Sequence, residues 1–403
     1  MSLTSVEDAL KSILDGATPL RAEDVPLREA DGRFLAADLA ARRTQPPADM
    51  SAMDGYAVRQ ADLAALPATL AVVGEAAAGH PYDKSLEPGQ AVRILTGAPV
   101  PAGADTIVIQ ENCARDGDAI AVSEPQAAGR FIRRAGLDFS AGDVLLPAGT
   151  ALNPRLLALA AAMGHGGLPV HRRPVVAILS TGDELVEAGS EAGDSQIIAS
   201  NAHGVAAMVA RAGGEPLDLG IARDDQQAIA ERIAFARGRR ADILVTLGGA
   251  SVGDHDLVGP ALADLGMKLG FWKIAMRPGK PLMSGRLGDM RVLGLPGNPV
   301  SSIVCTRVFV LPLVAALAGD DPGRYLDTRV AVLGRDLAEN DRRQDYLRAT
   351  LETVDGRMVA TPFPAQDSSM LATLSRAAAL VIRAPFEPAA KAGSACRIML
   401  LDA

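Results

Sequence analysis

The sequence predicts a multidomain chain of the α/β plus β class, and three observations support this. The chain has 403 residues, which is enough for roughly two to four domains. Apolar strand-like runs alternate with helical patterns across residues 174–318, as in a mostly parallel sheet with helical crossovers. Short strands separated by Gly and Pro turns fill residues 68–137 and 328–403, which indicates two smaller β domains.

The composition restricts the class of protein. Hydrophobic residues make up 48% of the chain and charged residues 22%, as expected for a globular protein with a large core. The net charge of −8 argues against broad nucleic-acid binding. Three isolated cysteines, without metal-site spacing, favour a reducing, cytoplasmic compartment. The N-terminus lacks the basic start of a signal peptide. The apolar run 308–318 is too short to span a membrane and contains Pro312.

The N-terminal part begins with an amphipathic pattern. Apolar residues follow helical spacing over residues 4–15, and Thr4 with Glu7 fits a capping box. After a linker at Pro46-Pro47, residues 51–57 place Asp54 beside a glycine before a strand. An Asp-Gly pair is also an ordinary hairpin turn, so both interpretations stay open.

The predicted β region at 68–137 carries two further polar features. Residues 93–99 form a strand that ends in Thr96, glycine and proline. Residues 130–138 form a basic cluster that ends in Asp138. Solvent-facing charges are the default interpretation of such a cluster, and an anion site is the more specific one.

Beyond residue 150 the pattern becomes that of alternating helices and strands. A short helix begins at Pro154 and runs to residue 163. Strands are predicted at 175–179, 217–221, 243–247 and 292–295, and helices at 201–212, 226–237, 257–265 and from 299 to 317.

Polar loops follow all four strands of this domain. Parallel strands would bring their carboxyl ends to one edge, where ligands bind in open α/β sheets. The crevice would contain the acids Asp183, Glu184, Asp224, Asp254 and Asp256. An all-oxygen set of carboxylates suits Mg²⁺. Asp224 has an alternative role, since Asp is a preferred cap for the helix at 226–237.

The loop after residue 247 is the centre of this prediction. Residues 244–256 read LVTLGGASVGDHD, a buried strand that breaks into glycines and then acids. Glycines allow positive φ and the close approach of a ligand. A plain strand–helix loop with solvent-facing acids is the alternative. His255 is a weaker candidate for a place in the site.

Anion-binding groups accompany the acids. Lys273, Arg277 and Lys280 lie within eight positions, and the helix predicted from residue 299 would offer its N-terminus. Carboxylates that bind a metal ion, together with cations that bind oxyanions, are typical of sites that carry out phosphoryl chemistry. The glycines fit neither a P-loop nor a dinucleotide fingerprint, and no nucleophile elbow surrounds Ser251.

These motifs together resemble the molybdopterin molybdenumtransferases, the MoeA and gephyrin E-domain family. The matching segments run through most of the chain: SAMDGYA at 51–57, RILTGAPVP at 93–101, IRRAG at 132–136, STGDEL at 180–185, GGASVGDHD at 248–256, KIAMRPGKP at 273–281 and LPGNPVS at 295–301. STGDEL and GGxSxG also occur more widely in pterin-binding domains. The combination of SAMDGYA, RPGKP and LPGNPVS is specific to this family.

The resemblance implies an elongated, multidomain subunit with a central α/β molybdopterin-binding-like three-layer domain. The expected parts are a discontinuous N-terminal helical and linker domain (1–41 and 138–171), an inserted β domain (42–137), the α/β domain (172–320) and a C-terminal β domain (321–403). It also implies a homodimer whose site lies at the subunit interface.

The resemblance also implies a reaction. Adenylylated molybdopterin and molybdate would give molybdenum cofactor and AMP, with the help of Mg²⁺. Catalytic roles are expected for Asp54, Thr96, Asp138, Glu184, Asp224 and Asp256, and metal binding for the last three of these. Substrate or oxyanion binding is expected for Gly249, Ser251, Lys273, Arg277, Lys280, Pro296, Asn298 and Ser301. Arg277 stands where some relatives carry lysine, which replaces a point charge by a planar fork.

The resemblance extends to partners, and two other functions stay open. The molybdopterin adenylyltransferase and molybdoenzyme apoproteins are the expected protein partners; neither nucleic acid nor membrane is expected. A nucleotide or pyrophosphate hydrolase could use the same α/β domain without molybdate. The second is a scaffolding role, as in the neuronal relative gephyrin. It has little support, because the sequence shows no long linker or extra domain.

Overall fold

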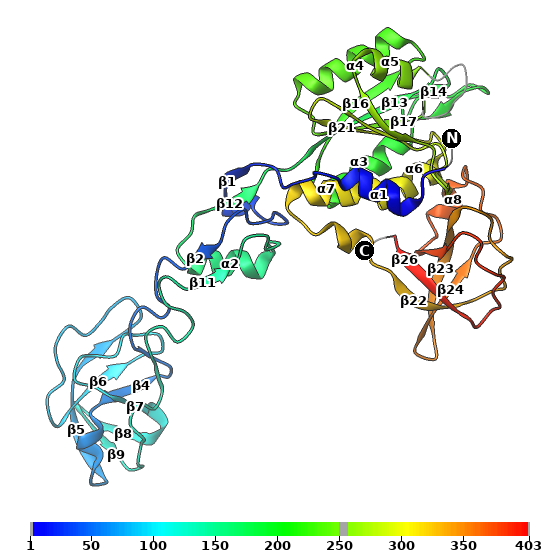
Figure 1. Ribbon diagram of the computed structural model, residues 1–403. Helices are drawn as coiled ribbons and strands as arrows, with labels where there is room; N and C mark the ends of the chain where they lie inside the picture. The colour runs from blue at the N-terminus through cyan, green and yellow to red at the C-terminus, as the bar shows by residue number, and fades with distance from the viewer. Residues whose placement is uncertain (1–2, 250–256, 402–403) are drawn as a thin grey trace. The chain divides into compact units, whose positions relative to one another are not determined.

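A computed structural model describes residues 3–249 and 257–401, and its chain forms two compact units (Figure 1). One unit comprises Met1–Glu23, Gly32–Ala36 and Pro169–Ala403. The other comprises Asp24–Asp31 and Ala37–Leu168. The α/β plus β class is confirmed, whereas the division into four domains at the predicted boundaries stays a prediction.

The larger unit contains the predicted α/β domain. Its sheet has the order β16-β13-β17-β21-β20-β18. The strands are β13 (Val175–Thr181), β16 (Glu215–Ala222), β17 (Ile243–Leu247), β18 (Lys268–Trp272), β20 (Met283–Leu287) and β21 (Met290–Leu295). The four predicted strands, β16, β13, β17 and β21, are parallel neighbours, as expected. The sequence interpretation missed β18 and β20, which extend the sheet antiparallel beyond β21. The hairpin between β20 and β21 turns at Gly288, whose φ is +63°.

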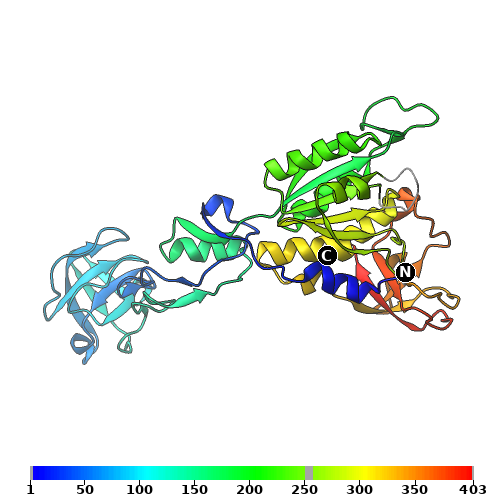
Figure 2. The same ribbon diagram turned by 45° about the horizontal axis from the view of Figure 1, so that its top comes forward.

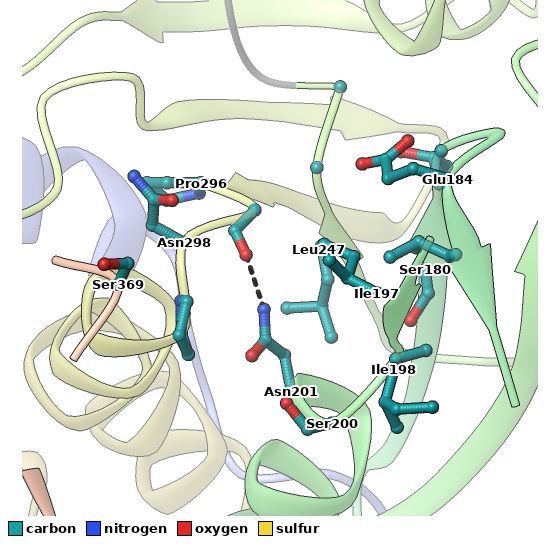
Figure 3. Close-up of a pocket in the computed structure, with 18 of the residues that line it drawn as sticks. Ser180, Glu184, Ile197, Ile198, Ser200, Asn201, Leu247, Pro296, Asn298 and Ser369 are labelled. Atoms are coloured by element: carbon teal, nitrogen blue, oxygen red, sulfur yellow. Dashed lines mark hydrogen bonds between the residues drawn. The ribbon is translucent and has the colours of Figure 1, made fainter. Parts of the chain in front are cut away.

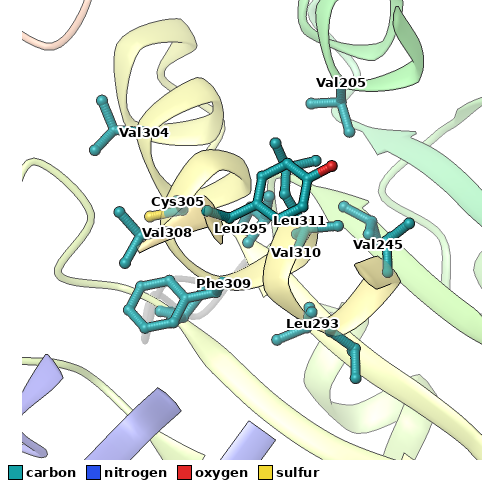
Figure 4. Close-up of a cluster of buried hydrophobic side chains, with 14 of the residues drawn as sticks. Val205, Val245, Leu293, Leu295, Val304, Cys305, Val308, Phe309, Val310 and Leu311 are labelled. Carbon is teal, nitrogen blue, oxygen red and sulfur yellow. The ribbon is translucent and has the colours of Figure 1, made fainter. Parts of the chain in front are cut away.

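Helices cover both faces of this sheet (Figure 2). They are α3 (Asn201–Arg211), α4 (Gln226–Gly238), α5 (Val258–Asp264), α6 (Pro299–Cys305) and α7 (Leu311–Ala318). Alternate residues of each strand point to opposite faces. On β13, Val176 and Ile178 therefore join a core with α3 and the helices after residue 299, while Ala177 and Leu179 join a second core with α4 and α5. Figure 4 shows part of the first core.

The last helix of this domain is unusually apolar. Residues 299–318 form a continuous helix of 20 residues in which a π-helical segment, Thr306–Val310, joins α6 to α7. Its length and mean hydropathy of 2.1 would suit a membrane span, but 94% of the apolar window is buried inside the protein. The helix is therefore the central core helix of the domain, packed under the sheet.

The C-terminal segment forms a β-barrel in the same unit. Its sheet order is β19-β23-β24-β22-β26-β25, and β25 also pairs with β23, which closes the barrel. The strands are β19 (Met276–Arg277), β22 (Arg329–Leu333), β23 (Gln344–Val354), β24 (Arg357–Pro362), β25 (Ala379–Arg383) and β26 (Ala395–Leu400). Since β19 belongs to the 273–281 segment, the α/β domain and the barrel share a strand pairing.

The smaller unit contains the predicted β region. Its six-stranded sheet has the order β7-β4-β6-β5-β9-β8. These strands are β4 (Gly55–Val58), β5 (Ala68–Ala76), β6 (Gln90–Ile94), β7 (Thr106–Ile109), β8 (Cys113–Asp116) and β9 (Ala119–Val122). Shorter pairings join β2 (Leu39–Ala40) with β11 (Val144–Leu146), and β3 (Met50–Ser51) with β10 (Ile132–Arg133). In the same unit, Asn153 caps α2 (Pro154–Ala162). Two further strands, β1 (Ala22–Pro26) and β12 (Gly167–His171), pair with each other, and each has residues in both units.

The cap of the N-terminal helix lies one residue later in the chain than predicted. Helix α1 spans Val6–Leu14, and its cap is Ser5, whose hydroxyl accepts the backbone N–H of Asp8 at 3.0 Å. The predicted capping box of Thr4 and Glu7 is therefore wrong. Thr4 instead forms backbone hydrogen bonds with Lys273 and Ala275, which hold it in an extended bridge.

Candidate functional site

The four predicted loops meet at the carboxyl edge of the parallel strands. They surround a cavity of about 790 Å³, a volume that suits a small-molecule ligand. Residues at or just after the ends of all four strands line it: Thr181 at the end of β13, Gly182 and Glu184 after β13, Asp224 after β16, Gly248 and Gly249 after β17, and Pro296–Pro299 after β21. The prediction of one shared crevice at this edge is confirmed.

Two glycines bring the loop after β17 close to its neighbours. Gly248 and Gly249 have φ values of +101° and +61°, which L side chains rarely adopt. A Cβ on Gly248 would lie 2.7 Å from the Thr181 carbonyl oxygen, and one on Gly249 only 2.2 Å from a methyl group of Val258. Both positions therefore require glycine for conformational and for steric reasons.

The acids of the crevice have separate roles. Glu184 and Asp224 line the cavity. Asp183 instead accepts the backbone N–H of Asp224 at 3.2 Å, so it supports the Asp224 loop. Asp225 caps α4, because its carboxylate accepts the Ala228 N–H at 2.7 Å. The alternative interpretation of Asp224 as the helix cap is therefore wrong.

The oxygen donors of the cavity fit the chemistry of Mg²⁺. Besides the carboxylates of Glu184 and Asp224, the buried hydroxyl of Thr181 faces the loop glycines and has no hydrogen-bond partner within the described segments. Mg²⁺ takes oxygen ligands and keeps several waters, so it needs few protein ligands. Within residues 3–249 and 257–401, no three His, Cys, Asp or Glu side chains form a metal-binding group. The third predicted ligand, Asp256, lies outside the described residues, as do Ser251, Asp254 and His255.

The loop after β21 makes a second wall of the cavity. Pro296 and Asn298 line the cavity as predicted, whereas Ser301 is buried and does not. The Asn298 amide donates to the Ser368 hydroxyl at 2.9 Å, and the Val300 N–H donates to the Ser368 carbonyl at 3.1 Å. This backbone donor at the helix N-terminus is therefore already engaged by the barrel.

The sequence interpretation missed several residues of the cavity. Figure 3 shows Ser369, Ile197, Ile198 and Asn201 around it, and Asn201 donates to the Gly297 carbonyl at 2.6 Å. Ser369 belongs to the barrel, so its position depends on long-range packing that no local pattern reveals. The isoleucine pair was detectable as an apolar dipeptide within a polar stretch.

The three predicted oxyanion-binding cations do not line the cavity. Its wall includes Pro281, which directly follows Lys280 in the chain. Lys280 is exposed and Lys273 is half-buried. Neither ammonium group has an ion pair or hydrogen bond to any residue that the structure describes. Their oxyanion role stays a prediction.

Arg277 faces the barrel. Its guanidinium forms a bidentate pair with Asp345, with Nε 2.8 Å from Oδ1 and Nη2 in contact with Oδ2. Nη1 lies 3.5 Å from Asp341. The hydrogen bond to Asp345 raises the pKa of Arg277, while burial raises the pKa of Asp345 against the opposing effect of the arginine. This geometry gives Arg277 a structural role and does not support the oxyanion role predicted for it.

The smaller unit holds the other predicted site residues. Asp54 Oδ1 accepts the backbone N–H of Thr96 at 2.7 Å and its hydroxyl at 2.8 Å. The hydrogen bond from the Thr96 backbone, and then the one from its hydroxyl, lower the pKa of Asp54. The Asp54 side chain is exposed. Asp138 is exposed in the segment that follows the basic cluster. The structure thus brings Asp54 and Thr96 together, and the catalytic roles of the three residues stay predictions.

Comparison with protein families decides the identity of the chain. Three family models match in order: the MoeA N-terminal region (domain I and II) over residues 4–164, a probable molybdopterin binding domain over 177–316 and the MoeA C-terminal region (domain IV) over 330–401. The chain is 40% identical to the molybdopterin molybdenumtransferase of Nostoc sp. over 342 residues, 83% of this chain and 78% of the relative.

The chain belongs to the MoeA family of molybdopterin molybdenumtransferases. The chain is also 34% identical to the molybdopterin molybdenumtransferase of Bacillus subtilis, over 94% of this chain and 89% of that protein. The crystal structure of a molybdopterin biosynthesis MoeA protein from Pyrococcus horikoshii matches with a TM-score of 0.85, at 29% identity and 99% coverage of both chains. The predicted family and fold are therefore confirmed, and the chain is an enzyme of molybdenum cofactor biosynthesis.

Proposed function

We propose that this MoeA-family chain transfers molybdenum from molybdate into adenylylated molybdopterin, with release of AMP and formation of molybdenum cofactor. The observation that carries the proposal is the cavity at the sheet edge, where Glu184 and Asp224 face a ligand-sized space inside the matched molybdopterin-binding region. Phosphoanhydride cleavage needs an ion that neutralises charge on the departing phosphate, and two carboxylates at this edge can supply its ligands.

Mg²⁺ is the proposed metal, with Glu184, Asp224 and Asp256 as its ligands. When bound, it would neutralise negative charge on the phosphates of the substrate. Glu184 and Asp224 both line the cavity, and a cation bound by the two carboxylates would reduce any repulsion between them. The proposed role of these carboxylates is therefore to bind the metal ion and, through it, to orient the phosphoanhydride of the substrate.

The remaining groups have proposed binding roles. Lys273 and Lys280 would attract molybdate or substrate phosphates to this edge, and the glycine loop would let the ligand approach the backbone. Asp54, Thr96 and Asp138 would complete the site from a second copy of the chain in a homodimer. Arg277 is left out of the oxyanion site because its guanidinium is engaged by Asp345.

The cellular setting is also proposed. The enzyme would act in the cytoplasm, receive its substrate from the molybdopterin adenylyltransferase and deliver cofactor to molybdoenzyme apoproteins. The absence of disulfides among Cys113, Cys305 and Cys396 fits a reducing compartment.

The deciding experiment measures AMP released from adenylylated molybdopterin by the purified enzyme, with and without molybdate and Mg²⁺. The expected result is AMP release that requires both ions and accompanies the appearance of cofactor able to activate a molybdoenzyme apoprotein. AMP release that proceeds fully without molybdate, with no active cofactor, would instead identify a pyrophosphate hydrolase.

A further inference from the structure

Arg93 joins three strands of the smaller unit close to Asp54. It belongs to β6, where its register partner on β4 is Tyr56. The guanidinium carbon lies 5.1 Å from the centre of the buried Tyr56 ring, which is a cation–π distance. Since the strand order is β7-β4-β6, the Arg93 side chain extends across β4 toward the end of β7.

The Arg93 guanidinium contacts both segments that hold Asp54. Nη2 donates to the Gln110 side-chain oxygen at 2.6 Å, and Nη1 donates a long bond of 3.5 Å to the Gly55 carbonyl. Gly55 directly follows Asp54 in the chain, and the Gln110 N–H donates to the Asp54 carbonyl at 3.2 Å. Arg93 therefore binds the covalent neighbour of Asp54 and the residue that holds its backbone.

The Asp54 carboxylate is held at one oxygen only. Oδ1 accepts the Thr96 N–H at 2.7 Å and the Thr96 hydroxyl at 2.8 Å, whereas Oδ2 has no hydrogen bond to any residue that the structure describes. The backbone beside it packs closely, because a Cβ on Gly55 would lie 2.0 Å from the Val108 carbonyl oxygen. The direction in which Oδ2 faces solvent therefore depends on the backbone that Arg93 holds.

The charge of Arg93 also acts on this carboxylate. Hydrogen bonds from the Thr96 backbone and then from its hydroxyl are the main causes that lower the pKa of Asp54. The positive charge of Arg93 lowers this pKa further, against a small opposing effect of burial. Arg93 thus favours the ionised form of Asp54 as well as contacting its surroundings.

We propose that Arg93 is a positioning residue for Asp54, because its guanidinium ties β4 and β6 to Gln110 and so fixes the direction of the free Asp54 oxygen. This inference rests on the proposed function, which gives Asp54 a catalytic role. A planar guanidinium reaches two acceptors at once, which the single ammonium of a lysine does not reproduce. In this role Arg93 acts through Asp54 and not on the substrate.

The first test measures AMP release from adenylylated molybdopterin by the wild type and by Arg93→Met. The variant should lower kcat by about 10-fold and leave KM nearly unchanged, because a misdirected carboxylate slows the reaction without weakening substrate binding. Arg93→Lys keeps the charge but not the two-acceptor contact, so its kcat should also fall.

Two further variants separate this contact from general damage. Gln110→Ala removes the distant acceptor of the guanidinium and should lower kcat in the same direction. Gln110 is exposed, so this variant should fold even if Arg93→Met does not. Arg115→Met is the matched control. Arg115 belongs to the same sheet and donates to the Gly117 carbonyl at 3.0 Å, so its loss should leave kcat and KM unchanged.

A second test asks whether Arg93 acts through Asp54. In the Asp54→Asn variant, the carboxylate that Arg93 positions is already absent. Adding Arg93→Met should therefore cause little further loss of the residual AMP release, so the two effects should not be additive. A purely structural role would lower the residual rate again by the same factor.

The pH profile provides a third readout, which a loss of stability does not move. Without the positive charge of Arg93, the pKa of Asp54 rises, so more of this carboxylate is protonated at low pH. The acid limb of the kcat profile should therefore move to higher pH in Arg93→Met. In Arg93→Lys, which keeps the charge, this limb should stay close to its wild-type position.

Three results would overturn the positioning role. The first is a wild-type kcat in Arg93→Met or, if that variant does not fold, in Gln110→Ala. The second is a rise in KM at unchanged kcat, which would instead make Arg93 a substrate-binding residue. The third is an equal loss of activity in the Asp54→Asn background. The failure of the proposed function is distinguishable from these results, because the wild type itself would then release no AMP in a molybdate-dependent manner.

Discussion

Two adjacent acids, Asp224 and Asp225, have different positions and therefore different expected roles. Asp224 lines the cavity, while Asp225 caps α4 through the Ala228 N–H. Asp224→Asn should cut Mg²⁺-dependent AMP release by roughly 10- to 100-fold, the size of a lost charge-assisted contact, with little change in stability. Steady-state AMP release at several Mg²⁺ concentrations measures this, and raised Mg²⁺ should partly restore the rate.

Asp225→Ala is the matched control for that variant. It should lower the free energy of unfolding by about 1 kcal/mol, the typical cost of a lost helix cap, and leave AMP release intact. Denaturant unfolding and the same AMP assay give both values. If Asp224→Asn released AMP normally and without Mg²⁺, Asp224 would have no place in a metal site.

The glycine loop allows a second prediction at the scale of one residue. Gly249→Ala should impair both stability and ligand binding, because a Cβ would meet Val258 and the φ of +61° costs an L residue about 1–2 kcal/mol. Thermal unfolding and AMP titration would measure the two effects.

A second substitution at the contact tests the steric cause. Val258→Ala removes the methyl group that lies 2.2 Å from the added Cβ, so it should relieve part of the loss in Gly249→Ala. A double-mutant cycle would show this as a favourable coupling energy. Strictly additive losses would mean that the clash with Val258 does not limit the position.

At the scale of elements, local patterns predicted most of the α/β domain. The apolar, β-branched run at Ile243–Leu247 is β17 with the expected bounds, and the helix expected at 201–212 is α3. The strand is predictable because burial on both faces leaves a continuous apolar signal. The helix is predictable because its buried residues, Ala202, Val205 and Val209, recur at helical spacing. The shared edge of the four loops followed from parallel topology alone.

Elements defined by distant partners were harder to predict. The barrel residue Ser369 reaches the cavity only because Ser368 binds the loop around Asn298, a contact between residues 70 positions apart. The structural role of Arg277 likewise depends on Asp345, which is 68 positions away. Charge spacing along the chain cannot distinguish a cation that faces a ligand from one that faces a distant carboxylate.

The pairing of β19 with β23 gives a prediction at this scale. Arg277 and Asp345 are register partners in these strands, and Asp345 is buried. Arg277→Ala should lower the free energy of unfolding by about 1–3 kcal/mol, because it leaves a buried carboxylate without its partner. Denaturant unfolding measures this, and Asp345→Asn in the same chain should recover part of the loss. Unchanged stability with weakened molybdate binding would instead restore the oxyanion role.

The same pair predicts a pH dependence. Burial raises the pKa of Asp345 above its ordinary value, so the folded protein holds this proton more tightly than the unfolded chain. Stability contributed by this group therefore falls as the pH rises from the unfolded-state pKa near 4 through the folded-state value. Without Arg277, which lowers this pKa, the fall should be steeper and extend to higher pH. Unfolding titrations of wild type and Arg277→Ala between about pH 4 and 7 would detect the difference.

At the scale of the whole molecule, the predicted site residues belong to two compact units. Glu184 and Asp224 lie in the larger unit, and Asp54 and Thr96 in the smaller one. Membership of the MoeA family explains why one chain carries both sets of predicted site residues. The sequence alone could not show that the two sets belong to one site. A homodimer that builds each site from two copies would explain why both sets carry motifs of the family.

Mixing two inactive variants tests this shared site. Asp54→Asn and Asp224→Asn should each reduce AMP release strongly when pure. If each site combines the smaller unit of one copy with the larger unit of the other, a mixed dimer contains one intact and one doubly altered site. Random exchange of equal amounts should therefore recover about a quarter of the wild-type rate, since half of the dimers are mixed. Sedimentation should show dimers throughout. No recovery after subunit exchange, or full activity in a monomer, would mean that each chain builds its own site.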